Sequence, residues 1–284
     1  MFHCGRFRFD LARPLLMGIV NVTPDSFSDG GRHASAEAAI AHGLRLAAEG
    51  ADILDIGGES TRPGATPVPL EEELARVLPV LAGLRDCGVA LSIDTMKPAV
   101  MAAALAAGVD LVNDVNALRA PGALEVVAAS NCGVCLMHMR GTPQTMQIAP
   151  EYADVVAEVE AFLVERMAAA RQAGIAPARL TLDPGFGFGK TTAQNIALFR
   201  GLGRFAAHAP LLIGVSRKSL FGKLVGRATA DRTSASIAAA LLAVARGAAI
   251  IRVHDVAATA DALKVQQVLG DADFTPKEQC HEKS

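Results

Sequence analysis

Two kinds of hydrophobic segment alternate along most of the chain. Short aliphatic runs are typical of buried parallel strands, and longer alanine- and leucine-rich segments have the spacing of helices. The predicted strands are 15–20, 52–57, 89–94, 110–114, 133–138, 179–183, 211–216 and 250–254. The predicted helices lie near 35–49, 70–86, 97–107, 121–130, 152–173, 194–206, 232–246 and 256–268. We expect Pro79 to kink or shorten the second helix.

Eight strand–helix units in one apolar chain predict an α/β fold, a single closed (β/α)8 TIM barrel. Such barrels often use 250 residues or more as one domain, and this chain has 284. No linker rich in Ser, Gly or Pro divides it. We therefore expect one domain over 1–284, with a short N-terminal extension, a core from about 12 to 270 and a flexible tail over 271–284.

Charge and composition argue against two classes of partner. A formal net charge of −2 gives no bulk attraction to nucleic acid or to an anionic membrane. The absence of tryptophan and the single tyrosine leave little surface for stacking on bases. The N-terminus lacks the apolar run of a signal peptide, and no later segment has eighteen uninterrupted apolar residues. We expect a cytoplasmic protein with no nucleic-acid or membrane partner.

The cysteines carry one candidate motif. Cys132 and Cys135 have the spacing of a redox or zinc pair, but they run into an apolar strand. Residues three apart on a strand point to opposite faces, so a role in the core is the favoured interpretation.

The stretch "DPGFGFGKT" over 183–191 looks at first like a phosphate-binding loop. A P-loop needs glycine four residues before the Gly-Lys-Thr triplet, and Pro184 occupies that position. The alternating glycines do not fit the dinucleotide fingerprint either. The remaining interpretation is an acid, Asp183, at the end of a strand, followed by a turn that glycine makes easily. Lys190 and Thr191 are then expected to begin the next helix.

Every predicted strand ends beside polar residues. Polar strand ends are common where a strand meets solvent, but eight in eight, with acids and bases together, favour a functional site. In a (β/α)8 barrel these ends meet at the mouth where active sites lie. The residues are Asn21, Glu59, Ser60, Thr61, Arg62, Asp94, Asn113, His138, Asp183, Arg217, Lys218, Ser219, Arg252 and His254.

The acids at these ends suggest a ligand rich in N–H donors. A carboxylate such as Asp94 or Asp183 accepts two parallel hydrogen bonds from an N–C–N edge, as an aminopyrimidinone presents. Arg252, His254 and Lys218 offer positive charge to an anion.

Asn21 is the one residue at the mouth that is expected to act as a metal ligand. Any metal is therefore expected to be largely hydrated Mg²⁺ that arrives with phosphate. The segments 21–33 and 57–69 are rich in Gly, Pro and Ser and are expected to be irregular and mobile.

These residues together resemble the dihydropteroate synthase family of bacterial folate biosynthesis. The matching stretches occur in the family's order over about 2–270, and no motif position departs from the pattern. They are "MGIVNVTPDSFSDGG" (17–31), "GADILDIGGESTRPGA" (50–65), "SIDT" (92–95), "VNDV" (112–115), "MHMRGTPQTMQ" (137–147), "DPGFGFGKT" (183–191), "GVSRKS" (214–219) and "RVHDV" (252–256).

The resemblance implies a transferase that joins 7,8-dihydropterin-6-ylmethyl diphosphate to 4-aminobenzoate, with Mg²⁺ as cofactor. It implies catalytic roles for Asp94, Asp183, Lys218, Arg252 and His254, and pterin binding by Asp94, Asn113, Asp183, Lys218 and Arg252. Diphosphate would meet Asn21, Thr61, Arg252, Val253 and His254, with Asn21 as the metal ligand. Aminobenzoate would meet Phe27, Thr61, Arg62, Pro63, Phe188 and Ser219, while Asp25 and Asp29 would help to order diphosphate.

The same resemblance implies partners and a mechanism. Loss of diphosphate would leave a stabilised pterin cation, which the neutral arylamine attacks without a strong general base or a covalent intermediate. Sulfonamides, which resemble the arylamine, would compete for its site. The family also implies a homodimer formed through the later helices.

Three other functions are consistent with parts of the sequence. A pterin-binding methyltransferase domain would lack "SRKS" and "TPDSFSDGG", which are present here. A Schiff-base aldolase could use Lys218 at a strand end, and borohydride trapping with a carbonyl substrate would reveal it. A silent pterin-binding scaffold is expected to have lost Asn21, Arg252 or His254, and all three are present.

Overall fold

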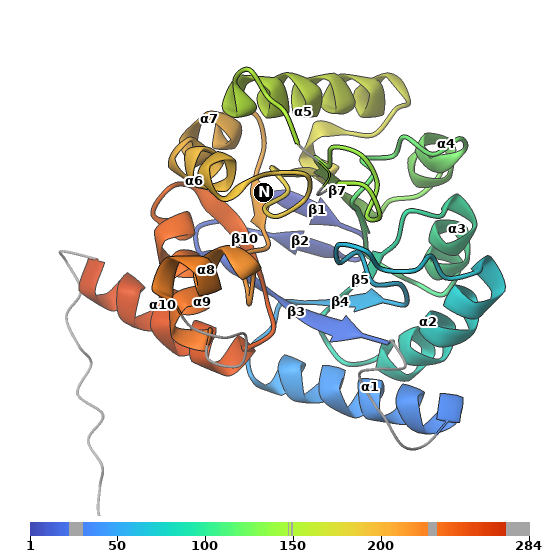
Figure 1. Cartoon of the computed structure of the whole chain (residues 1–284). Helices are drawn as coiled ribbons and strands as arrows, with labels where there is room; N and C mark the ends of the chain where they lie inside the picture. Colours follow the sequence, from blue (N-terminus) through green and yellow to red (C-terminus); the bar gives the residue numbers. More distant parts are fainter. Residues whose placement is uncertain (23–30, 147, 149, 227–231, 271–284) are drawn as a thin grey trace, which may run out of the picture.

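Eight parallel strands close into a barrel in the order β10-β3-β4-β5-β6-β7-β8-β9, and helices form a ring around it (Figure 1). The computed structural model describes residues 1–22, 31–146, 148, 150–226 and 232–270. The predicted TIM barrel is thus confirmed. The predicted tail over 271–284 lies outside the described residues, as does most of the segment 21–33.

All eight predicted strands are present in the barrel. They are β3 (Leu15–Asn21), β4 (Ile53–Gly57), β5 (Ala90–Asp94), β6 (Leu111–Asp114), β7 (Gly133–Met137), β8 (Leu180–Asp183), β9 (Leu211–Ile213) and β10 (Ala248–Val253). The strand predicted over 211–216 is too long at its end. Its chain leaves the sheet after Ile213 and reaches Arg217, whose φ of 55° is incompatible with a strand.

The helices follow the predicted pattern with three differences. They are α1 (Gly31–Ala48), α2 (Leu70–Leu84), α3 (Pro98–Ala106), α4 (Ala123–Ala128), α5 (Val155–Gln172), α6 (Thr192–Arg200), α7 (Leu202–Ala206), α8 (Ser219–Val225), α9 (Thr233–Val244) and α10 (Val256–Gly270). The helix predicted over 194–206 divides at Gly201. Helix α2 continues through Pro79 and ends at Leu84, and α8 was not predicted.

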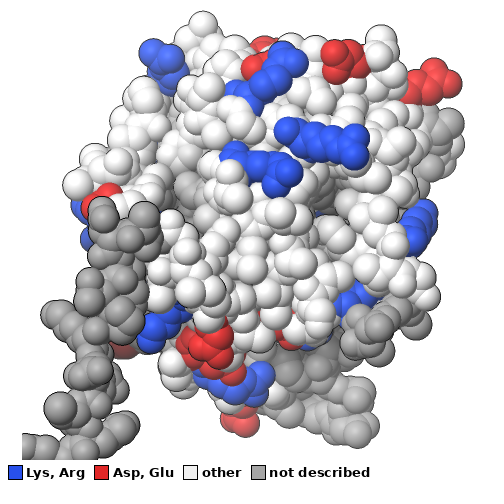
Figure 2. Space-filling view, turned by 90° about the vertical axis from the view of Figure 1, so that its left-hand side faces the viewer, with Lys and Arg blue, Asp and Glu red and all other residues white. Residues whose placement is uncertain are grey.

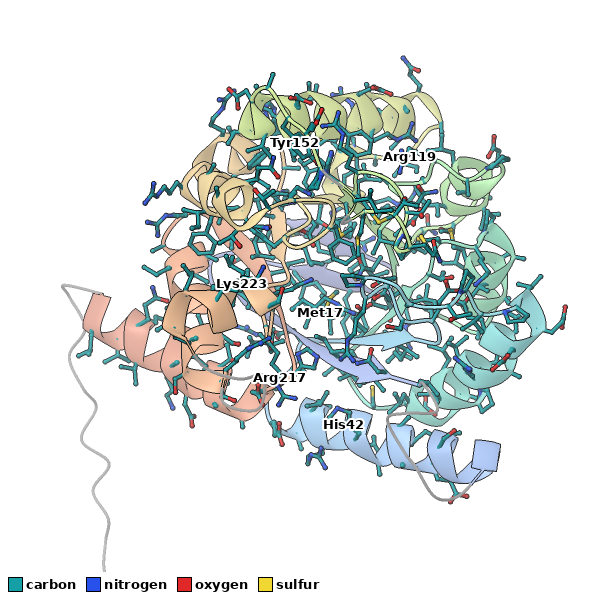
Figure 3. All side chains as sticks on the ribbon, in the orientation of Figure 1. Met17, His42, Arg119, Tyr152, Arg217 and Lys223 are labelled. Carbon is teal, nitrogen blue, oxygen red and sulfur yellow. The ribbon has the colours of Figure 1, made fainter. Side chains whose placement is uncertain are left out.

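The barrel interior changes from apolar to polar along the strands. Alternate residues of a strand face inward. The lower layers hold Met17, at the centre of the ring of helices (Figure 3), together with Ile53 and Ile250. Two residues further along their strands, Ile53 is followed by Asp55 and Ile250 by Arg252. The mouth of the barrel is therefore lined by charged groups, while its other end is a packed core.

An N-terminal hairpin closes the apolar end of the barrel. Strands β1 (Phe2–Cys4) and β2 (Phe7–Phe9) pair antiparallel, and only a short extension had been predicted there. Arg6 forms an ion pair with Asp110 at 2.8 Å, just before β6 begins. Phe2 is fully buried, and a Cβ added to Gly133 at the start of β7 would lie 2.7 Å from its Cζ. The hairpin thus covers the N-terminal ends of the strands.

Replacing Phe2 with alanine tests this role. Phe2→Ala should lower the free energy of unfolding by about 3 kcal/mol, because it removes a fully buried aromatic ring. The exposed Leu44→Ala on α1 is the control and should change it by less than about 0.5 kcal/mol. Denaturant unfolding measures both, and equal losses would contradict a plug formed by the hairpin.

Candidate active site

The guanidinium of Arg252 joins two acids at the centre of the mouth. Its Nε donates to Asp55 Oδ2 at 2.6 Å, and its Nη2 donates to Asp94 Oδ2 at 2.7 Å. Asp55 also accepts hydrogen bonds from Ser92 Oγ at 2.6 Å and from Asn113 Nδ2 at 3.0 Å. The cation of β10 thus connects β4 and β5, and Asp55 joins β6 to the group through Asn113.

Burial and charge act in opposite directions on this group. Burial alone would lower the pKa of Arg252, but Asp55 and Asp94 outweigh it and raise that pKa, so the guanidinium stays charged. Burial raises the pKa of Asp94 to about 7. The attraction of Arg252 does not cancel that rise, because Asp55 shares the same guanidinium and repels Asp94. Asp94 is therefore the member of the group whose charge responds to pH near neutrality.

The acids at the strand ends present acceptors to the mouth. Asp94 Oδ1 is buried and, within the part of the chain that the structure describes, has no hydrogen-bond partner. Asp183, at the end of β8, accepts from Gly185 N at 2.7 Å through Oδ1. Burial raises the pKa of Asp183, while that hydrogen bond and Lys218 oppose the rise. A buried acceptor without a donor is rare in proteins and suits a ligand that supplies N–H groups.

Lys218 and Phe188 form a second wall of the mouth. Lys218 is the residue before α8, and its Nζ lies 4.4 Å from the centre of the Phe188 ring. Desolvation lowers the pKa of Lys218 to about 8, partly offset by Asp183. Phe188 packs against a cluster of apolar side chains, namely Val115, Met137, Met139 and Met146. The wall thus combines a cation with an apolar surface.

His254 is held as a neutral imidazole beside the mouth. Ser216 Oγ accepts from His254 N at 3.2 Å and lies 2.9 Å from His254 Nδ1. Burial, together with the positive charges of Arg217 and Arg252, lowers the pKa of His254 to about 3. Because the Ser216 hydroxyl proton can then be donated to Nδ1, Nε2 carries the ring proton. Val253, buried on β10, can reach a ligand only through its backbone.

Asn21 is the one predicted metal ligand. It ends β3 opposite Gly57, and Gly57 pairs with Asp94 on the next strand, so Asn21 and Asp94 lie at one level of the mouth. Among the described residues, no group of three or more His, Cys, Asp or Glu side chains could hold a metal ion. A single amide oxygen fits a hydrated Mg²⁺ that is bound mainly by a ligand's phosphates.

The second predicted loop follows β4 and takes the irregular path expected. Its residue Gly64 donates from N to Pro143 O at 3.1 Å, and Ala65 O accepts from Gln144 Nε2 at 3.2 Å. Thr61 is half-buried, while Arg62 and Pro63 are exposed. Arg62 is close enough to Lys218 and His254 to lower the pKa of both.

Several other predicted residues lie away from the group formed by Arg252 and its acids, or outside the described residues. Ser219 is exposed at the start of α8. Arg217 pairs with Asp255 at 2.5 Å, and the ring of His138 packs edge-on against Phe162 at 4.9 Å. The three first-loop residues, Asp25, Phe27 and Asp29, lie outside the described residues.

The glycine turn after β8 is tied together by Lys190. The Lys190 Nζ donates to Gly185 O at 2.8 Å, Phe188 O at 3.0 Å and His138 O at 3.2 Å. Gly185 has a φ of 73°, and a Cβ there would lie 1.9 Å from His138 O, so only glycine fits. Thr191 caps α6 as predicted, but Lys190 precedes the helix and points into the turn.

The two cysteines of the candidate redox motif are buried apart from each other. Cys132 belongs to the core between barrel and helices, and Cys135 to the core inside the barrel. Burial raises the pKa of both thiols, which disfavours reactive thiolates. The cysteines that the structure describes are free thiols.

Comparison with known proteins decides the family. The profile of the family described as "Pterin binding enzyme" matches residues 17–254. The dihydropteroate synthase of Neisseria meningitidis serogroup B is 56% identical over 278 residues, which cover 95% of this chain and 98% of that protein. The chain belongs to the dihydropteroate synthase family.

Solved structures of the dihydropteroate synthase family agree with this assignment. The Burkholderia cenocepacia enzyme complexed with 7,8-dihydropteroate is 52% identical, with a TM-score of 0.88 over 95% of this chain and 96% of that one. The Yersinia pestis enzyme with a sulfonamide drug is 45% identical, with a TM-score of 0.89 over 95% and 98%.

Two residues of this dihydropteroate synthase site were missed in the sequence. Asp55 lies two positions before the last residue of β4, and the alternation of strand residues makes it face inward like Gly57. That alternation was the available signal. Lys190 gave no such signal, because its partners are carbonyl groups that come together only when the turn folds.

Removing the Lys190 ammonium tests its hold on the glycine turn. Lys190→Met keeps an unbranched stem of nearly the same length but leaves the carbonyl oxygens of Phe188 and His138 without a donor, while Gly185 O still accepts from Phe188 N at 3.2 Å. Each such group costs about 1–3 kcal/mol, so we expect a loss of about 3 kcal/mol in the free energy of unfolding. Lys223→Met, at an exposed lysine of α8 (Figure 3), is the matched control. Denaturation curves that coincide for the two variants would refute this role of Lys190.

Proposed function

We propose that this chain condenses 7,8-dihydropterin-6-ylmethyl diphosphate with 4-aminobenzoate and releases 7,8-dihydropteroate and diphosphate, a step of folate biosynthesis. The observation that carries the proposal is the buried, unpaired Asp94 Oδ1 beside the Arg252 guanidinium. It is an acceptor in need of a donor, in a chain 56% identical to a dihydropteroate synthase.

The pterin is bound through its donor-rich edge. Asp94 and Asp183 accept from ring N–H and amino groups, and Asn113 completes the edge from β6. Arg252 offers the flat face of its guanidinium to the ring, since Asp55 and Asp94 fix its plane. Lys218 donates from the opposite wall. A ring held on several edges at once has one orientation, which places its methylene carbon toward the exit of the mouth.

Cleavage of the bond between the methylene carbon and diphosphate depends on stabilisation of the charge that develops on each of the two parts. Positive charge that develops on the ring is favoured by the buried carboxylates of Asp94 and Asp183. Arg252 and the Nε2–H of His254 stabilise the departing diphosphate as preorganised donors. The backbone of Val253 and the Thr61 hydroxyl are further groups that bind it. Asn21 would hold Mg²⁺, which supplies further positive charge to the diphosphate when bound.

The second substrate enters from the side of the loops. Phe188 gives an apolar face, and Thr61, Arg62, Pro63 and Ser219 surround the outer part of the mouth; Phe27 is assigned here by resemblance. The arylamine is neutral near pH 7 and attacks the methylene carbon as the C–O bond to diphosphate breaks. The resulting secondary ammonium is acidic and loses its proton to water or to diphosphate, so no side chain acts as a strong base. Sulfonamides carry the same arylamine and compete for this subsite.

A homodimer formed through the later helices is part of the proposal. Helices α8, α9 and α10 carry exposed apolar side chains, namely Leu224, Val225, Leu242, Val265 and Leu269. The side of the molecule that bears α9 and α10 is largely uncharged across its centre (Figure 2). Exposed apolar area of this kind favours association.

The cytoplasm is the proposed location of this activity. No helix among the described residues is both long enough and apolar enough to cross a bilayer.

Direct assay tests the proposed reaction. The purified chain, mixed with the pterin diphosphate, 4-aminobenzoate and Mg²⁺, should form dihydropteroate and diphosphate in equal amounts, and EDTA should slow the reaction. Asp183→Asn keeps the shape of the side chain but turns one acceptor into a donor, so kcat/KM should fall at least about tenfold. A wild-type chain that forms no dihydropteroate would refute the proposal.

A further inference from the structure

A group of charged side chains lies at the base of the second loop, with its two acids largely buried and its lysine partly exposed. Lys97 Nζ is bound by Glu59 Oε2 and by Glu73 Oε2. Glu73 also accepts from Thr95 Oγ1 at 2.6 Å through its other oxygen, and its side chain is only 1% exposed. The three charged residues come from the loop after β4, from the first turn of α2 and from the start of α3. We call Glu59, Glu73 and Lys97 the loop anchor.

The loop anchor closes the second loop at its base. Glu59 stands at the start of the loop and accepts from Val68 N, near its end, at 3.3 Å. Arg76 of α2 donates from Nη1 to Gly58 O at 2.7 Å. Both ends of the segment between Glu59 and Val68 are therefore held in place by hydrogen bonds.

The charges of the loop anchor depend on one another. Burial alone would lower the pKa of Lys97, but its bonds to Glu59 and Glu73 outweigh burial and raise it. Removal of one partner from such a group leaves an uncompensated buried charge. Buried ion pairs are poor sources of stability compared with apolar packing, and their best-attested benefit is a specific arrangement. The arrangement specified here is that of the loop.

The segment that the loop anchor holds carries Thr61, Arg62 and Pro63. Arg62 lies close enough to the mouth for its charge to lower the pKa of Lys218 and of His254. The tip of the loop also contacts the segment after β7, through Gly64 N and Pro143 O at 3.1 Å. The anchor at the base and this contact at the tip together hold the loop at two points.

We propose that Glu59, Glu73 and Lys97 are positioning residues for the aminobenzoate subsite. They touch neither substrate. They act by holding the base of the second loop, so that Thr61, Arg62 and Pro63 surround the arylamine and its sulfonamide analogues. This inference rests on the proposed function and adds to it the residues that set affinity for the second substrate.

The test separates the two substrates. Glu73→Gln keeps the shape of the side chain and removes its charge, and Lys97→Met removes the shared cation. In steady-state assays, both should raise the KM for 4-aminobenzoate and the Ki of a sulfonamide by about tenfold. The KM for the pterin diphosphate should rise far less, by no more than about threefold, because Thr61 is its only proposed contact on this loop, while Asp94, Asn113 and Asp183 stay in place.

A matched control removes an ion pair at the opposite end of the barrel. Asp52 binds Arg13 at 2.6 Å just before β4 begins, and Asp52→Asn should leave both KM values and the sulfonamide Ki unchanged. Glu59→Gln, in the loop itself, provides a third variant of the anchor in case Lys97→Met does not fold.

Two results would overturn the inference. Variants that lose thermal stability but keep the wild-type KM for aminobenzoate would show a structural role alone. An equal rise in both KM values would show general damage to the mouth. Either result, with an active wild-type enzyme, leaves the proposed reaction standing. A wild-type chain that forms no dihydropteroate would instead overturn the proposed function and this inference together.

Discussion

The arrangement of polar groups at the mouth of the barrel depends on one charged contact, that of Arg252 with Asp55 and Asp94. Both acids lie inside a closed barrel, where an unpaired carboxylate carries a large desolvation penalty. A single guanidinium with a planar fork of donors pairs with one oxygen of each acid, which a lysine could not do with the same geometry. The hairpin at the other end keeps water from entering below, so the charges of the interior open only toward the mouth.

The chemistry follows from the same arrangement. Since Arg252 is already fixed by two acids, it would meet the planar ring and the anion of the proposed reaction without reorganising, and such preorganisation is commonly the largest catalytic term. Asp94 keeps one buried oxygen for the ligand. The positioning role proposed for the loop anchor applies the same principle, because its charges would hold groups that contact the second substrate.

Sequence patterns predicted the barrel and the residues at the strand ends because both depend on local periodicity and strand direction. The eight strands, and Asp94, Asn113 and Asp183 at their exits, are of this kind. Features that depend on contacts distant in sequence were not predicted. Asp55 gains its role only opposite Arg252, which lies 197 positions away. Helix α7, which follows the break at Gly201, and the seven-residue α8 are too short to show a helical period in the sequence. The N-terminal hairpin has strands of three residues, below the length at which alternation can be recognised.

A double-mutant cycle on Asp55 and Arg252 tests the central contact most directly, with calorimetric affinity for a pterin alcohol as the measured quantity. Asp55→Asn and Arg252→Met should each weaken binding at least about tenfold, since a charge-assisted hydrogen bond contributes roughly 1.5–3 kcal/mol. If Asp55 acts through Arg252, the double variant should bind no more weakly than Arg252→Met alone. Losses that simply add would show that the two side chains act independently, and the account built on their contact would be wrong.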